Sequence, residues 1–240
     1  PGWDYRSSAV ITGADFAAAR GLLDRVGVAN GLVAIPSNGS VEENAARLAE
    51  ELRRRAREPK KLILVSASSA GPAVALALGG RPGAGEPCQV RAWLNAGGLL
   101  QGTPLVERYH TWPVSWFARF FVWLQDWDWE AVESMSPARS RARFARLRLP
   151  PHLLTLNYIG IPLSGSVTPL ARDNYYALRR QGPNDGLTLI TDALAPDGAT
   201  IAALGRDHYL AEDPELDLTT LALAQTLIVM LESRAPVSCP

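Results

Sequence analysis

Short apolar runs alternate along the chain with segments in which apolar residues recur at helical spacing. Two longer segments, residues 41–58 and 216–231, predict helices, and the first is amphipathic. Five short and nearly continuous apolar runs predict buried strands, at 31–36, 62–66, 90–95, 153–158 and 200–204. Strands alternating with helices favour an α/β protein with a mainly parallel sheet flanked by helices.

Residues 99–150 interrupt this alternation with a long segment rich in aromatic residues. Trp116, Phe120, Trp123 and Trp127 follow an i, i+4, i+7, i+11 spacing, which predicts one stripe along a helix. Long insertions in compact domains are often lids. We therefore expect a single domain over 1–240 with a helical, aromatic-rich cap at 99–150. The stripe either packs on the domain or lines an apolar substrate pocket, with Trp112, Trp116, Phe120 and Trp123 as candidate contacts.

Composition and charge exclude some classes of function. Arginine and lysine together number 24, as do aspartate and glutamate, so the chain lacks the basic excess that nucleic-acid binding requires. The apolar fraction of 47% suits a packed core, yet no run of 18 apolar residues predicts a membrane span. Cys88 and Cys239 form no metal-binding pattern; a disulfide between them is an alternative, but we expect free thiols. No metal or organic cofactor is implied, and the cellular compartment stays open.

The strongest candidate for chemistry is residues 61–71, where an apolar strand leads directly into small residues and then a helix. The run Ala67-Ser68-Ser69-Ala70-Gly71 fits the pattern G-x-S-x-G with alanine in place of the first glycine. That pattern is typical of a nucleophile elbow, a sharp turn that holds a serine between strand and helix. We predict Ser69 as the nucleophile, with Ser68 in the approach to it. The alternative is close packing of strand on helix without chemistry.

A serine nucleophile needs a base, and three histidines are available. His208 lies just past the last predicted strand, where the base of an elbow-type site belongs, because the chain order there is Ser, then Asp or Glu, then His. His152, at the start of a strand, is expected to be structural, and His110 to be an exposed residue of the cap.

The acid that orients the base should lie between the fourth predicted strand and His208. Asp185 is the best candidate, because it sits in a loop with Pro, Asn and Gly at turn positions. Asp192 and Asp197 are rivals and Asp173 is a weaker one, while Asp207 is expected to be a local loop residue.

A tetrahedral intermediate also needs amide donors. One is expected from the residue after the nucleophile, Ala70, and the other from the N-terminal turn, where Gly2 allows close approach and Trp3 offers its N–H.

Taken in order, Pro-Gly-Trp, A-S-S-A-G, N-D-G-L and D-H-Y resemble the α/β-hydrolase superfamily and its lipase-like and esterase-like members. The resemblance spans residues 1–209 and implies hydrolysis of carboxylic esters through an acyl-enzyme. It also implies that the acid lies in the Asn-Asp-Gly-Leu loop at 184–187. The chain departs from the pattern at Ala67, where glycine is usual, and at Pro1-Gly2, where His-Gly is common. Both departures leave the subfamily open.

Within this class the aromatic cap favours an apolar acyl or aryl substrate, and contact of the cap with a lipid surface is possible. An acyltransferase or thioesterase with the same triad, or a non-catalytic binding protein with this fold, are the alternatives.

The resemblance also implies one more strand, which would lie in the sheet between the strand at 31–36 and the strand at 62–66. We expect residues preceding Pro1, or another segment, to supply it. Direct pairing of the strand at Leu32 with the strand at Leu62 would contradict this expectation.

Overall fold

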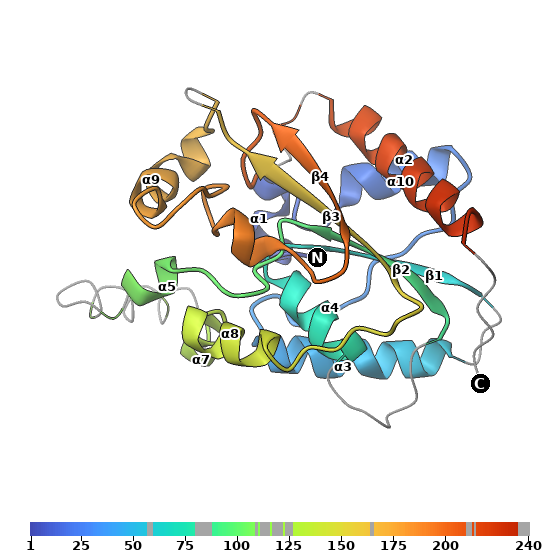
Figure 1. Cartoon of the computed structure of the whole chain (residues 1–240), viewed down its shortest axis with the longest axis horizontal. Helices are drawn as coiled ribbons and strands as arrows, with labels where there is room; N and C mark the ends of the chain where they lie inside the picture. The colour runs from blue at the N-terminus through green and yellow to red at the C-terminus, as the bar shows by residue number, and fades with distance from the viewer. Residues whose placement is uncertain are drawn as a thin grey trace.

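A single parallel sheet forms the centre of the molecule (Figure 1). The computed structural model describes residues 1–56, 60–79, 88–108, 110, 116, 122, 127–163, 166–209, 213 and 215–234. Within these residues, four strands pair in the order β1-β2-β3-β4, and every neighbouring pair is parallel. The strands are β1 (Leu62–Ala67), β2 (Val90–Ala96), β3 (Leu154–Ile161) and β4 (Ala199–Leu204).

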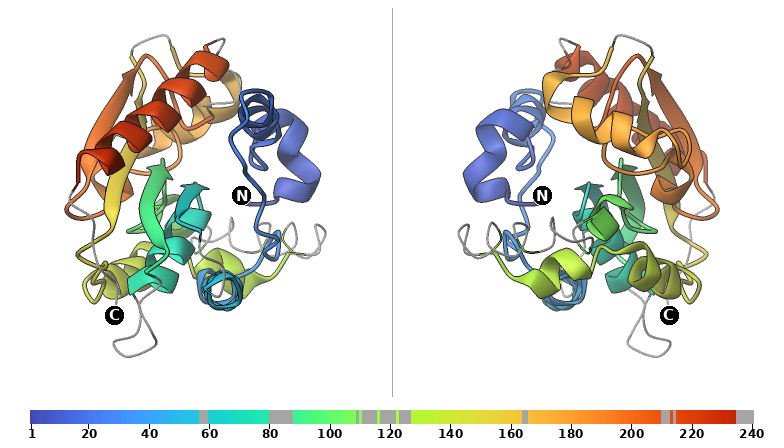
Figure 2. Two further views of the ribbon diagram at one scale, coloured as in Figure 1. Left: turned by 90° about the vertical axis from the view of Figure 1, so that its right-hand side faces the viewer. Right: turned by 90° about the vertical axis from the view of Figure 1, so that its left-hand side faces the viewer.

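Helices cover both faces of this sheet, as Figure 2 shows. On one face α3 (Val41–Arg55) and α4 (Ala70–Gly79) pack against each other and against β2, with Leu52, Leu78 and Trp93 in a shared apolar cluster. On the other face α10 (Leu216–Glu232) packs Leu227 against β2 and β3. Parallel strands alternating with helices require cover of this kind, because both faces of the strands are apolar.

Two of the remaining helices belong to the N-terminal part of the chain, and the others surround the carboxyl ends of the strands (Figure 1). They are short, and several start at a recognisable cap: Asp128 and Thr168 each accept a hydrogen bond from an N–H in the first turn that follows. Their bounds are α1 (Tyr5–Thr12), α2 (Ala17–Arg25), α5 (Leu105–Arg108), α7 (Trp129–Glu133), α8 (Pro137–Phe144), α9 (Pro169–Leu178) and the 3₁₀ helix η1 (Ile190–Ala193).

The structure confirms the mainly parallel sheet, four of the five predicted strands and both predicted helices. The prediction of a strand at 31–36 is wrong, because that segment has no regular structure. Ile35 is buried and its carbonyl accepts a hydrogen bond from the Tyr5 hydroxyl. An apolar run can therefore be anchored by side-chain contacts at one residue without forming a ladder.

Strand β1 lies at one end of the sheet order, and part of its surface is exposed. Ile63 and Val65, on the face that α10 covers further along the sheet, are 40% and 46% exposed. Residues 31–36 do not pair with β1, and β2 is the only strand that pairs with it in the described part of the chain. Direct pairing of residues 31–36 with β1, which would contradict an additional strand there, is thus not observed. The additional strand beside β1 stays a prediction.

Two further expectations concern the cysteines and the membrane. Cys88 is disulfide-bonded, so the expectation of a free thiol is wrong for this residue. Cys239 lies outside the described residues. Among the helices that the structure describes, none has the length and apolarity that crossing a bilayer needs. The division into one domain with a cap at 99–150 stays a prediction.

The exposed face of β1 gives a testable prediction for the 240-residue chain. Replacing Ile63 or Val65 by threonine should lower the free energy of unfolding by less than about 0.5 kcal/mol each, as for other exposed positions. Replacing the buried Leu52 by alanine should cost about 2–5 kcal/mol, because it leaves a cavity. Urea denaturation measures all three. A loss at Ile63 and Val65 as large as at Leu52 would show that another segment covers β1.

Candidate functional site

Two residues that are distant in the sequence meet at the carboxyl end of the sheet. His208 lies in the loop after β4, and Asp185 lies in the loop after α9. The Nδ1 atom of His208 is 2.7 Å from Oδ2 of Asp185, and the two side chains are only 6% and 1% exposed. A second bond joins the same loops, because the His208 amide donates to the Asp185 carbonyl at 2.8 Å. The pair is therefore fixed by backbone as well as by side chain.

The loop around Asp185 leaves one carboxylate oxygen for the histidine. Its other oxygen, Oδ1, accepts the amides of Leu187 and Thr188, both at 2.8 Å. The Asn184 side chain accepts the amide of Gly186, which has a φ of 96° that favours glycine. The sequence Asn-Asp-Gly-Leu thus folds into a turn that holds the carboxylate in one orientation.

The environment of His208 favours its charged form. Burial by itself lowers the pKa of His208, because a charged imidazole loses its hydration. The negative charge of Asp185 and its hydrogen bond act in the opposite direction, with a smaller contribution from Asp207. Together they outweigh burial and raise the pKa above the ordinary 6.5. A histidine in this setting can accept a proton and keep it while a reaction proceeds.

The rival acids have other positions. Asp192 pairs with Arg141 at 3.2 Å, Asp197 sits in a turn with a φ of 57°, and Asp173 lies within α9. In the part of the chain that the structure describes, only Asp185 forms an ion pair with His208.

The other two histidines lie elsewhere. His110 contacts Glu133 at 2.8 Å with its side chain 49% exposed. His152 lies just before β3, at the opposite end of the sheet from His208.

The turn between β1 and α4 identifies which serine is strained. Ser68 has a φ of 54°, a left-handed conformation that residues with a side chain rarely adopt. Its amide donates to the Ala96 carbonyl at 3.2 Å, and its carbonyl accepts the amides of Gly71 and Leu99. Ser69, one residue later, is buried with 8% exposure. An elbow holds its nucleophile at the strained residue and exposes its oxygen, so the backbone favours Ser68 over the predicted Ser69.

Gly71 explains why the sequence pattern pointed to Ser69 rather than to Ser68. A side chain there would lie 2.7 Å from the Gly98 Cα, so the glycine is required where α4 packs on the loop after β2. Around Ser68 the residues two positions away are Ser66 and Ala70, and both are small. The small residues that an elbow at Ser68 needs were therefore present in the sequence. Gly71 nevertheless favoured the alignment of the G-x-S-x-G pattern on Ser69.

The elbow and the histidine are neighbours through Gly97, which follows β2. A side chain at Gly97 would lie 3.4 Å from the His208 ring and 3.6 Å from Oδ2 of Asp185. Gly97 follows Ala96 directly, and the Ala96 carbonyl accepts the Ser68 amide. The loop after β2 is thus the common wall of the elbow and of the His208–Asp185 pair.

The N-terminal turn reaches the same place. A Cβ atom at Gly2 would lie 3.7 Å from the Ser68 Cβ. The amides of Gly2 and Asp4 donate to the carbonyls of Ala14 and Ser37, at 2.8 and 3.0 Å. The amide between them, that of Trp3, has no acceptor in the described part of the chain. Asp4, the next residue, has a strained φ of 50°. The turn therefore holds the Trp3 amide beside the elbow as a donor without an acceptor among the described residues.

Two tryptophans are in contact near the N-terminal turn. The Trp3 ring packs edge to face against Trp127, with 5.5 Å between ring centroids, and both join an apolar cluster that also contacts Leu187. Trp127 was part of the predicted stripe but was not among the candidate contacts. Of those, Trp116 is 66% exposed, whereas Trp112, Phe120 and Trp123 lie outside the described residues.

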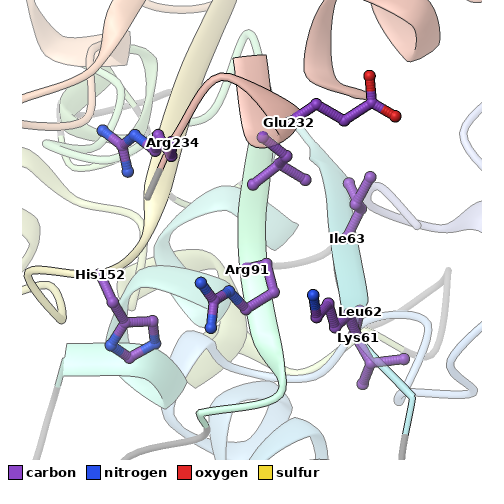
Figure 3. Close-up of a pocket in the computed structure, with 8 residues that line it drawn as sticks. Lys61, Leu62, Ile63, Arg91, His152, Glu232 and Arg234 are labelled. Carbon is purple, nitrogen blue, oxygen red and sulfur yellow. The ribbon is translucent and has the colours of Figure 1, made fainter. Parts of the chain in front are cut away.

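A cavity of about 310 Å³ lies at the other end of the sheet and is shown in Figure 3. Lys61, Arg91, His152 and Arg234 contribute to its walls, at the amino ends of β1 and β2. Ligands of open α/β sheets bind beyond the carboxyl ends of the strands, where Ser68 and His208 lie.

The described residues also contain no cluster of three or more side chains that could hold a metal ion.

The sequence matches no family model and no curated protein. Several solved structures are similar across most of the chain. The metagenomic carboxyl esterase MGS0156 has a TM-score of 0.69 and 22% identity, covering 90% of this chain and 69% of that chain. The mature Bacillus licheniformis lipase BlEst2 has a TM-score of 0.68 and 19% identity, covering 96% and 89%. Staphylococcus hyicus lipase has a TM-score of 0.69 and 12% identity, covering 91% and 89%.

These similarities extend over nearly the whole chain, and they agree with a parallel sheet flanked by helices. The chain therefore has the α/β-hydrolase fold that these esterases and lipases share.

Proposed function

We propose that this protein is a serine hydrolase that cleaves carboxylic esters, with Ser68, His208 and Asp185 as its triad. The observation that carries the proposal is the buried His208–Asp185 pair at 2.7 Å, adjacent through Gly97 to a strained serine. A buried titratable group whose pKa is shifted by burial and by a specific charged partner is a candidate for a functional site. The esterases and lipases of similar fold support the reaction class.

The residues divide the reaction between them. The Ser68 Oγ attacks the ester carbonyl carbon while Nε2 of His208 takes the hydroxyl proton, and Asp185 accepts the Nδ1–H and stabilises the imidazolium. The tetrahedral intermediate collapses as His208 returns the proton to the leaving alkoxide, which departs as an alcohol. Water then attacks the acyl-serine by the same route and releases the carboxylic acid.

In this proposal, two amides receive the negative charge of the intermediate. With Ser68 as the nucleophile, the donor from the following residue is Ser69 rather than the predicted Ala70. The second donor is the Trp3 amide, whose neighbours on both sides are already bonded. Removing one such donor typically costs about 10²–10³ in kcat.

The substrate side of the proposal is an ester with an apolar acyl or aryl group. Trp3, Trp127 and Leu187 are partly buried around one apolar cluster, and Leu187 directly follows the loop of Asp185. Burial of apolar surface is worth about 25 cal/mol per Å², so such walls favour esters with larger apolar groups. Contact of the segment around Trp116 with a lipid surface remains part of this proposal.

Matched serine variants separate the two candidates for the nucleophile. Ser68→Ala should lower kcat for a p-nitrophenyl ester by about 10⁴-fold or more, and should abolish labelling by a fluorophosphonate probe. Ser69→Ala keeps its amide and should retain most activity and full labelling. The reverse result would restore Ser69 as the nucleophile. Labelling of neither the variants nor the unmodified protein would support a non-catalytic binding protein instead.

The acid is tested in the same way. Asp185→Asn should lower kcat by about 10⁴-fold, because the histidine loses the acceptor that fixes its tautomer. Asp192→Asn is the matched control, since Asp192 is also buried but pairs with Arg141. Steady-state kinetics with both variants decides the assignment. A fully active Asp185→Asn enzyme would exclude Asp185 as the acid.

The pH dependence follows from His208. The base must be neutral to accept the serine proton, so kcat/KM should rise with pH and level off above the pKa of His208. Because that pKa is raised, the midpoint should lie above about 6.5. A pH–rate profile of ester hydrolysis measures it, and a midpoint clearly below pH 6.5 would contradict the assignment.

A further inference from the structure

The loop that carries His208 holds a second buried carboxylate. Asp207 directly precedes His208 and is 3% exposed, although nothing in the triad uses it. Burial of an aspartate costs free energy unless its oxygens are hydrogen-bonded. Both oxygens of Asp207 are bonded to main-chain amides: Oδ2 accepts the Thr168 amide at 2.7 Å, and Oδ1 accepts the Tyr209 amide at 2.9 Å.

The bond from the Thr168 amide joins the His208 loop to the start of helix α9, whereas the bond from the Tyr209 amide lies within the loop. Thr168 is the N-cap of α9, and its own hydroxyl accepts an amide of the first turn. The negative charge of Asp207 thus lies at the positive end of the helix, where it is favourable. This hydrogen bond, between residues 39 positions apart in the sequence, therefore fixes the loop of His208 relative to α9.

Helix α9 in turn contacts the loop of the acid. A Cβ atom at Gly186 would lie 2.7 Å from the Cβ of Ala171, in the first turn of α9. Further along the helix, the Tyr175 carbonyl accepts the Asn184 side chain at 3.5 Å. The segment from Thr168 to Tyr175 accordingly touches the base loop at one end and the acid loop along its length.

Asp207 also acts on His208 by charge. The charged groups acting on the imidazole are Asp185 from the acid loop and Asp207 from its own loop, and both favour the protonated ring. The nearest cation of that loop, Arg206, is paired with Asp213 at 2.8 Å.

We propose that Asp207 is a positioning residue for the catalytic pair, holding the His208 loop on α9 so that His208 and Asp185 stay in register. It touches neither substrate nor reacting atoms. The inference rests on the proposed ester hydrolysis for its kinetic consequence, but the position and charge of His208 can be measured without any activity.

The first test replaces the carboxylate with its neutral isostere. Asp207→Asn should lower kcat by about 10- to 100-fold, by analogy with the loss of outer-shell partners of metal-binding histidines, with KM little changed. The acid limb of the pH profile should move to lower pH, because one negative charge beside the imidazole is gone. Asp192→Asn, a buried aspartate outside this tie, should leave the limb in place.

The second test removes the tie without touching the carboxylate. Thr168 has a φ of −62°, which proline matches, so Thr168→Pro deletes the amide that Asp207 accepts. Thr168→Ala loses the capping hydroxyl but keeps that amide, and it is the matched control. The proline variant should lose kcat relative to the alanine variant at equal KM. This comparison decides the proposal if Asp207→Asn fails to fold.

The third measurement is independent of catalysis. Proton NMR of the histidine ring protons gives the pKa of His208, with the resonance assigned by its loss in a His208→Gln variant. The pKa should fall in Asp207→Asn and stay unchanged in Asp192→Asn. An unchanged His208 pKa together with equal kcat in the two Thr168 variants would overturn the proposal. An inactive unmodified protein with the expected pKa change would instead reject ester hydrolysis and keep the positioning role.

Discussion

The contact between His208 and Asp185 is the constraint around which the site is arranged. A buried carboxylate beside a buried imidazole is stable only when further hydrogen bonds satisfy it, and two amides of the Asp185 loop supply them. The same requirement fixes the loops themselves, since the His208 amide bonds the Asp185 carbonyl. The His208 loop follows β4 and the Asp185 loop follows α9, so the packing of these two elements decides whether the pair forms.

Strain is placed at the points where the chain must turn towards this pair. Ser68 and Asp4 both have a left-handed backbone, although neither is glycine. Such residues cost about 1–3 kcal/mol each and persist only where the surrounding structure holds them. Around Ser68 the holding bonds come from Ala96, Gly71 and Leu99. The sheet and α4 therefore supply the stability that the elbow uses.

Much of this architecture could be predicted from the apolar pattern, because a strand buried on both faces or an amphipathic helix has a recognisable sequence. The pattern located β1 to β4, α3 and α10, and chain order together with the turn residues around Asp185 suggested Asp185 and His208. It erred at 31–36, where apolar residues anchor a segment that has no strand partner. In the elbow the sequence allows both Ser68 and Ser69, and Gly71 favoured Ser69 because it resembles the glycine of the motif although it packs against Gly98.

The sequence by itself determined an α/β chain with a serine turn after an apolar strand, an aspartate in an Asn-Asp-Gly turn and a histidine after the last strand. These follow from local preferences of side chain and backbone, which act over a few residues. Only the tertiary structure decided which serine is strained, which aspartate meets the histidine, and that Asp207 bonds the start of α9. Those outcomes depend on contacts between residues far apart in the chain, and no local pattern encodes their distances.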